Sequence, residues 1–289
     1  MWVPPYDCSV FADNSILHRE IKSTNDQLQL QNDLNKVFKW AEQWQMCFNA
    51  VKCEFLQITR KTKPLKHTYS VDGKNITETY KHKYLGVTIN KHLDWKDHVQ
   101  NITSSARSTL GVLRRNLSSC PRVVKNRTYQ ALVRPKLEYA SAVWNPHASG
   151  QVNSLESVQR QAARFVTNNY DRTASVTEML QDLQWDSLAT RRMTHQCAMF
   201  YKIRLGLVNI PFPSCVIPSN RLGRVTNTCC YQNIQARVNS FKYSFFVRVI
   251  PVWNRLPTPV VSASSIHQFQ SLALPVLRGL QPIPTHLRL

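Results

Sequence analysis

Lysine and arginine side chains are the most prominent candidate functional groups in this sequence. The 289 residues hold 37 Lys and Arg against 17 Asp and Glu, a formal net charge of +20. Such cations neutralise phosphates and release counterions, so their chemistry is binding rather than bond breaking. The charge balance therefore predicts a polyanionic partner, and nucleic acid is the default polyanion. An inert basic surface is the alternative, whereas an anionic membrane is disfavoured because the cations form no compact cluster.

The excess charge is spread unevenly along the chain. Residues 1–60 hold 6 basic and 7 acidic side chains, residues 61–140 hold 16 and 5, and residues 141–289 hold 15 and 5. No Asp or Glu follows Asp186, although 12 Lys and Arg do. Positively charged side chains in such a region repel one another unless a polyanion is near. The candidate phosphate contacts, with plain solvated helix faces as the alternative, are Arg107, Arg114, Arg115, Arg122, Lys125 and Arg127.

The cysteines and histidines form no metal-binding pattern. The eight Cys include no C-x-x-C, and no Cys/His set has zinc-finger spacing, so no zinc is predicted. No stretch of about 18 apolar residues is present, so no membrane span is expected. The first ten residues lack the basic start and apolar core of a signal peptide. We therefore expect reduced thiols in a cytoplasmic or nuclear protein rather than a secreted one.

The elements that position these side chains begin with a predicted hairpin and helix. Asp13 and Asn14 lie between two short apolar runs, and such Asx pairs favour tight turns, so a β-hairpin with these residues at its tip is predicted. Ser23 or Thr24 then offers an N-cap. Apolar residues recur at helical spacing after this cap, which predicts an amphipathic helix over residues 25–46.

Further along, the pattern changes from strands to helices. A strand is predicted at residues 55–58, a hairpin at Asp72-Gly73 and another strand at residues 84–89. From Pro211 onward the periodicity weakens, which predicts an irregular tail. Between these regions, the predicted helices cover residues 95–117, 121–143, 151–167, 175–183 and 187–205.

One short segment carries a resemblance to a known family. Phe11-Ala12-Asp13-Asn14 resembles the aromatic-Ala-Asp-Asp hairpin of reverse transcriptases. Other segments in chain order are similar to the family's next palm motif, its primer grip and its thumb, and two resemble stretches typical of non-LTR (LINE-type) retrotransposon polymerases. In order, these segments are Trp44–Leu56, Tyr84–Gly86, Ala106–Leu117, Arg134–His147 and Ser244–Pro257.

The resemblance implies nucleotidyl transfer and names the residues that would take part. In the family, two Mg²⁺ ions bind the attacking 3′-hydroxyl and the leaving pyrophosphate. Asp13 matches a metal ligand, Asn14 replaces the usual second Asp, and Lys52 matches a lysine near the phosphates of the incoming deoxynucleoside triphosphate. The implied partner is RNA or an RNA–DNA duplex, and the implied primer-grip residues are Tyr84, Leu85 and Gly86.

The resemblance also implies parts that have no counterpart in this sequence. The family's fingers and its first palm strand, which carries another metal-binding Asp, lie upstream of the hairpin. We therefore expect an α+β chain with a partial palm over residues 1–92, a helical thumb over 93–170 and a basic, partly irregular region over 171–289. We expect no polymerase activity from it alone. A non-catalytic nucleic-acid-binding module and a poorly folding remnant with open sheet edges are the alternatives.

Two tryptophans add a separate hypothesis. Trp144 and Trp253 each precede an Asn, and aromatic side chains can stack on bases. Buried core aromatics are the commoner case, so we expect both rings in the core.

Overall fold

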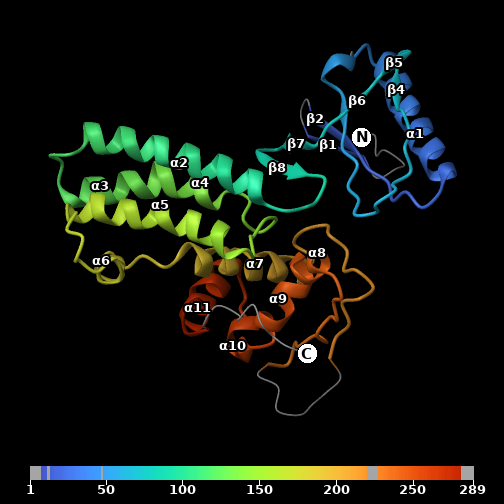
Figure 1. Cartoon of the computed structure of the whole chain (residues 1–289). Coiled ribbons are helices and arrows are strands. Elements are labelled where there is room, and N and C mark those ends of the chain that lie inside the picture. Colours follow the sequence, from blue (N-terminus) through green and yellow to red (C-terminus); the bar gives the residue numbers. More distant parts are fainter. Residues whose placement is uncertain (1–7, 12–13, 47, 220–226, 281–289) are drawn as a thin grey trace. The chain divides into compact units, whose positions relative to one another are not determined.

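The chain forms two units, which are built from helices and short β-hairpins (Figure 1). The computed structural model describes residues 8–11, 14–46, 48–219 and 227–280. Unit 1 is Met1–Asp94 and unit 2 is Trp95–Leu289. Unit 1 mixes strands with one long helix, while the described elements of unit 2 are helical, as an α+β chain requires. The predicted further boundary at residue 170 stays a prediction.

The first two strands form a hairpin where one is predicted, but Asn14 belongs to the second strand rather than to the tip. β1 (Cys8–Phe11) pairs antiparallel with β2 (Asn14–Leu17), and Phe11 lies opposite Asn14. The register therefore leaves a two-residue connection, as a tight turn requires. Asp13 itself lies outside the described residues.

A second predicted hairpin is also confirmed. β4 (Ser70–Val71) pairs antiparallel with β5 (Lys74–Asn75). The two turn residues both have positive φ, 48° at Asp72 and 71° at Gly73. Both angles suit a type I′ turn, whose backbone matches the twist of the strands.

The remaining strands correct two predictions. β3 (Glu54–Phe55), which pairs in parallel with β6 (Thr77–Glu78), is shorter than the predicted strand at residues 55–58. The continuous strand predicted at residues 84–89 is wrong. The chain reverses there, and β7 (Lys81–Tyr84) pairs antiparallel with β8 (Val87–Asn90).

The long helix of unit 1 begins at the predicted cap. In α1 (Thr24–Gln43), the Ser23 hydroxyl accepts a hydrogen bond from the Asp26 amide, and the Asp26 carboxylate accepts one from the Ser23 amide at 2.7 Å. This reciprocal capping box satisfies donors that the first turn leaves unpaired. The small core beside the helix contains Tyr69, Val71 and Ile76, with Leu30, Leu34 and Phe38 packed against it.

Unit 2 begins with helices that run side by side in Figure 1. The helix predicted over residues 121–143 ends at Glu138 and contains a π-helical turn before Pro135. Proline lacks an amide hydrogen and its ring clashes with the carbonyl four residues earlier, so a widened turn accommodates it. The elements are α2 (Lys96–Asn116), α3 (Arg122–Thr128), η2 (Tyr129–Val133), α4 (Arg134–Glu138) and α5 (Ser149–Thr167).

The tail is less irregular than predicted. Pro251 and Pro275 lie inside helices and Pro257 and Pro259 lie at the start of another, so the helical pattern is broken into short pieces. A membrane span would need a helix of about 18 mostly apolar residues, and the described part of the chain contains no such helix. The remaining elements are α6 (Val176–Asp182), α7 (Leu188–Arg204), α8 (Asn239–Lys242), α9 (Phe245–Trp253), α10 (Thr258–Val261) and α11 (Ile266–Gly279).

Both tryptophans of the stacking hypothesis lie in the core. Trp144 and Trp253 are each 0% exposed. The Trp253 indole N–H donates to the Cys229 carbonyl at 2.9 Å, and its ring packs against Phe200 and Phe269. A ring with no exposed surface and a satisfied N–H is unavailable to a base, so the core interpretation is confirmed.

A half-buried histidine on α7 makes the stability of unit 2 depend on pH. Burial lowers the pKa of His195 below its ordinary value, and its Nδ1 lies 2.7 Å from the Ser141 hydroxyl. Its contribution is present above the unfolded-state pKa, about 6.5, and is lost as pH falls, because the unfolded chain then binds the extra proton.

We therefore expect thermal stability to fall between pH 7 and pH 5, and a His195→Gln variant to lose part of this dependence. The difference should stay below the one-proton limit of about 1.4 kcal/mol per pH unit, because the ring keeps some solvent contact. Melting temperatures of both proteins across this range measure it. Parallel curves would contradict the assignment.

Candidate nucleic-acid interface

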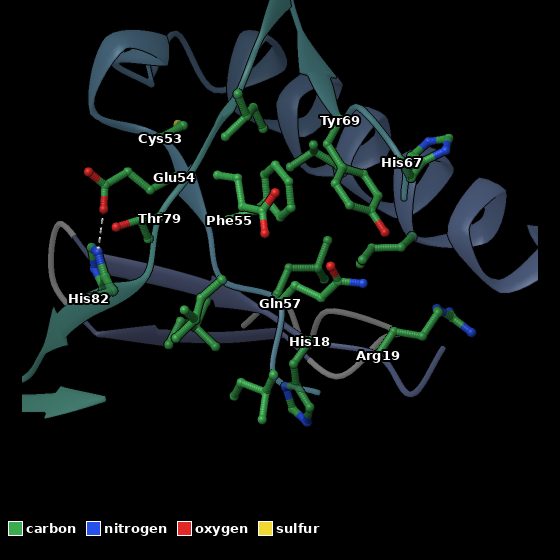
Figure 2. Close-up of a pocket in the computed structure, with 18 of the residues that line it drawn as sticks. His18, Arg19, Cys53, Glu54, Phe55, Gln57, His67, Tyr69, Thr79 and His82 are labelled. Carbon is green, nitrogen blue, oxygen red and sulfur yellow. Dashed lines mark hydrogen bonds and ion pairs between the residues drawn. The ribbon is translucent and has the colours of Figure 1, made fainter. Parts of the chain in front are cut away.

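A cavity of about 1330 Å³ lies within unit 1 (Figure 2). Its walls come from β2, α1, β3, the segment between β3 and β4, and strands β6, β7 and β8. Leu30, Leu34 and Phe38 of α1 give it one apolar side. A concave surface with an apolar wall and a few polar groups is the usual form of a binding site.

One ion pair and one histidine–carboxylate contact hold the polar side of the cavity. Figure 2 shows Glu54 beside His82, and Glu54 Oε2 lies 2.9 Å from His82 Nδ1. Arg19 is paired with Asp33 at 2.5 Å. Burial raises the pKa of the Cys53 thiol, which disfavours the thiolate needed for a nucleophile. The arrangement can therefore bind a ligand, but it presents no activated nucleophile.

Lys52 and Tyr84 are predicted site residues that both line this cavity. Lys52 ends a short 3₁₀ helix, η1 (Ala50–Lys52), and is exposed. The helix is capped by Asn49, whose side-chain oxygen accepts from the Val51 amide at 3.1 Å. The cap fixes the backbone from which the Lys52 ammonium extends.

The β7–β8 turn holds the other two predicted primer-grip residues. Leu85 and Gly86 have φ values of 43° and 81°, so both central positions are left-handed. Gly adopts this region freely, whereas Leu pays for a steric clash of its Cβ. Leu85 is also 37% exposed, an apolar side chain at a strained turn. Strain of this kind concentrates at functional sites.

Replacing Leu85 by Asn is expected to stabilise unit 1 by about 0.5–1 kcal/mol, because Asn tolerates the left-handed region. Denaturant unfolding measures the change. Leu65→Asn is the matched control, since Leu65 is also 37% exposed but lacks a positive φ. A gain equal to that of the control would show that the turn is not strained.

Three of the predicted phosphate contacts lie on α2. Arg107 donates to the Ser157 hydroxyl at 2.9 Å, and Arg114 lies over the Tyr170 ring at 5.3 Å. All three side chains, including Arg115, are exposed. Contacts at exposed sites are weak, so a phosphate can compete for these guanidinium groups.

The other three predicted cations lie on α3 and differ in exposure. Arg122 pairs with Asp182 at 2.5 Å, and Arg127 is exposed. Lys125 is only 4% exposed, with its ammonium 5.3 Å from the centre of the Phe165 ring. Its ammonium group therefore interacts with a ring inside the unit and is not exposed to a phosphate.

Sequence reasoning missed one cation that lies against α2. Lys136 is exposed, and its ammonium donates to the Thr109 hydroxyl at 2.7 Å and the Ser105 hydroxyl at 3.3 Å. It therefore adds a cation and two hydroxyl groups to a face of α2. The π-helical turn obscured this position, because it shifts the register of α4 relative to α3.

The described residues do not form the Mg²⁺ site that the resemblance implies. No three His, Cys, Asp or Glu side chains among them group so as to hold a metal. Glu54, the carboxylate beside Lys52 in the cavity lining, is already paired with His82. Asp13 lies outside the described residues, so no catalytic step follows from this geometry.

Comparison with known proteins confirms the resemblance. The chain is 27% identical over 154 residues to the RNA-directed DNA polymerase from mobile element jockey of Drosophila funebris, and 28% identical over 159 residues to that of Drosophila melanogaster. It is 22% identical over 163 residues to a probable RNA-directed DNA polymerase from transposon X-element of Drosophila melanogaster. These matches cover 51–55% of this chain but only 16–18% of the relatives. No family model matches the chain, and no solved structure matches it.

Proposed function

We propose that this chain is a portion of a reverse transcriptase of a non-LTR retrotransposon and that alone it binds nucleic acid without polymerising it. Similarity to RNA-directed DNA polymerases over about half of the chain is the observation that carries the proposal. In this proposal, residues 1–92 are the end of the palm, 93–170 the thumb and 171–289 the C-terminal region.

The proposed binding uses phosphates rather than bases. The exposed arginines of α2 would contact the backbone of RNA or an RNA–DNA duplex. Contacts of this kind fix position but carry little sequence information. Lys136, which is held by two α2 hydroxyl groups, is a further exposed cation of the same unit. By resemblance, Lys52 would face the phosphates of a deoxynucleoside triphosphate, and Tyr84 to Gly86 would support the primer end.

The proposed lack of catalysis rests on the metal site. Two-metal transfer needs several carboxylates arranged around the ions. By resemblance, Asp13 supplies one and Asn14 gives an amide oxygen, a weaker Mg²⁺ ligand. A non-catalytic module derived from the thumb is the second candidate, favoured by the net charge of the chain, which is +20.

We expect no templated product from the purified chain in a primer-extension assay with Mg²⁺ or Mn²⁺. The assay should include Asp13→Ala, which separates activity of this chain from a contaminating polymerase. Product made by the natural chain but not by Asp13→Ala would overturn the inactive assignment.

Binding to labelled RNA–DNA primer–template across a salt series tests the proposed nucleic-acid binding. Affinity that does not change with salt would argue against phosphate recognition.

A further inference from the structure

We propose that Arg192 and Arg248 form a phosphate-binding site in unit 2, centred on Asn145. The ligand is one phosphate group, either inorganic phosphate or a phosphodiester of a nucleic-acid backbone. The site lies where α7 and α9 meet the segment before α5. It does not depend on polymerase ancestry or on the α2 arginines.

Asn145 joins the two guanidinium groups. Arg192 Nε donates to the Asn145 side-chain oxygen at 3.3 Å, and the Arg248 guanidinium donates to the Asn145 backbone carbonyl. The Asn145 amide in turn donates to Gln196 Oε1 at 3.0 Å. Arg192, Asn145 and Gln196 are 1%, 7% and 2% exposed. Arg192 is thus held in a dry environment, and Asn145 joins it to a second, partly buried cation.

One nitrogen of the Arg192 guanidinium group has no hydrogen-bond partner. Arg192 Nη1 is buried and makes no hydrogen bond. Among the described residues, neither Arg192 nor Arg248 forms an ion pair. Burial lowers the pKa of each to about 10, which still leaves both charged at neutral pH. A buried charge is costly unless an opposite charge compensates it.

The nearby carboxylates are already in use. The two whose charges act on Arg192 are Glu138 and Glu156. Glu138 is paired with Arg191, and Glu156 accepts hydrogen bonds from the first amides of α7. No Asp or Glu follows Asp186 in the sequence, so α7 and α9 contain none. These carboxylates act on Arg192 from a distance but accept no hydrogen bond from it, so in this proposal a directly bound anion comes from outside these elements.

A phosphate fits the donors that this site offers. Guanidinium groups present paired N–H donors that match phosphate oxygens. Arg248 is only partly buried and lies near Tyr243, whose ring stacks on that of exposed His147 with the ring centres 3.7 Å apart. In this proposal a phosphate reaches Arg248 from its exposed side and then engages the unpaired Nη1 of Arg192.

Thermal unfolding of the full chain in inorganic phosphate, against chloride of the same ionic strength, tests the site. Phosphate at ten times its Kd is expected to raise the melting temperature by about 2–4 °C. Arg248→Gln should lose most of this shift. Arg255→Gln, which removes one charge from an exposed position just after α9, should keep it. If Arg248→Gln does not fold, Arg248→Lys replaces it and is expected to lose at least half of the shift.

A short single-stranded RNA then distinguishes the two sources of phosphate. Weaker binding of Arg248→Gln, by about fivefold or more, with Arg255→Gln unchanged, assigns the site to a backbone phosphodiester. Equal RNA binding by all three proteins, with the phosphate shift intact in the natural chain, assigns it to free phosphate. The site would stand in that case even if the proposed function failed.

Two results would overturn the proposal. The first is no difference between phosphate and chloride, together with RNA binding that Arg248→Gln leaves unchanged. The second is an equal loss in Arg248→Gln and Arg255→Gln, which would mean that net charge alone is responsible.

Discussion

Replacing Trp253 by Ala is expected to destabilise unit 2 by about 3–5 kcal/mol, as for other large-to-small changes of buried aromatic residues. The ring is 0% exposed and packs against Phe200 and Phe269. The change also leaves the Cys229 carbonyl without the indole donor that it accepts from at 2.9 Å. Urea unfolding followed by circular dichroism measures the loss.

Two further variants make this result specific. Trp44→Ala removes an indole that is 66% exposed and should cost no more than about 0.5 kcal/mol. Trp253→Leu removes the aromatic ring but keeps an apolar side chain, so the RNA affinity of the folded variant should remain unchanged. Base stacking is worth about 1–3 kcal/mol per base, and a loss of that size in a folded Trp253→Leu would restore the stacking hypothesis.

Changing Arg107, Arg114 and Arg115 together to Gln is expected to weaken binding to an RNA–DNA duplex by about 10²-fold at low salt. Each lost phosphate contact should reduce the slope of log affinity against log salt by about 0.7–0.9, or roughly 2–3 for the three. The measurement is a fluorescence anisotropy titration repeated across the salt series.

A second triple variant distinguishes the effect of losing the three α2 arginines from the effect of lowering the net charge. Arg160, Arg172 and Arg237 are exposed, and changing them to Gln removes the same charge elsewhere. Its slope should stay close to that of the natural chain. Equal losses in the two triple variants would mean that no particular face binds the duplex.

Local patterns predicted most of the elements correctly. The Ser23 cap, the Asp72-Gly73 turn and the α2, α5 and α7 helices follow from short-range hydrogen bonding and periodicity, which the sequence contains directly. The end of α4 and the helices after residue 238 were missed. There, prolines and a π-helical turn interrupt the periodicity on which such predictions depend.

Residue types and their spacing were enough to predict a polyanionic partner and to reveal the family resemblance, because charge balance and ordered motifs need no knowledge of the fold. Which cations are exposed to a phosphate became visible in the folded chain. It buries Lys125 against Phe165 and joins Arg192 to Arg248 through Asn145. Exposure and charge compensation depend on contacts between residues far apart in the chain, and these contacts exist only after the helices have packed.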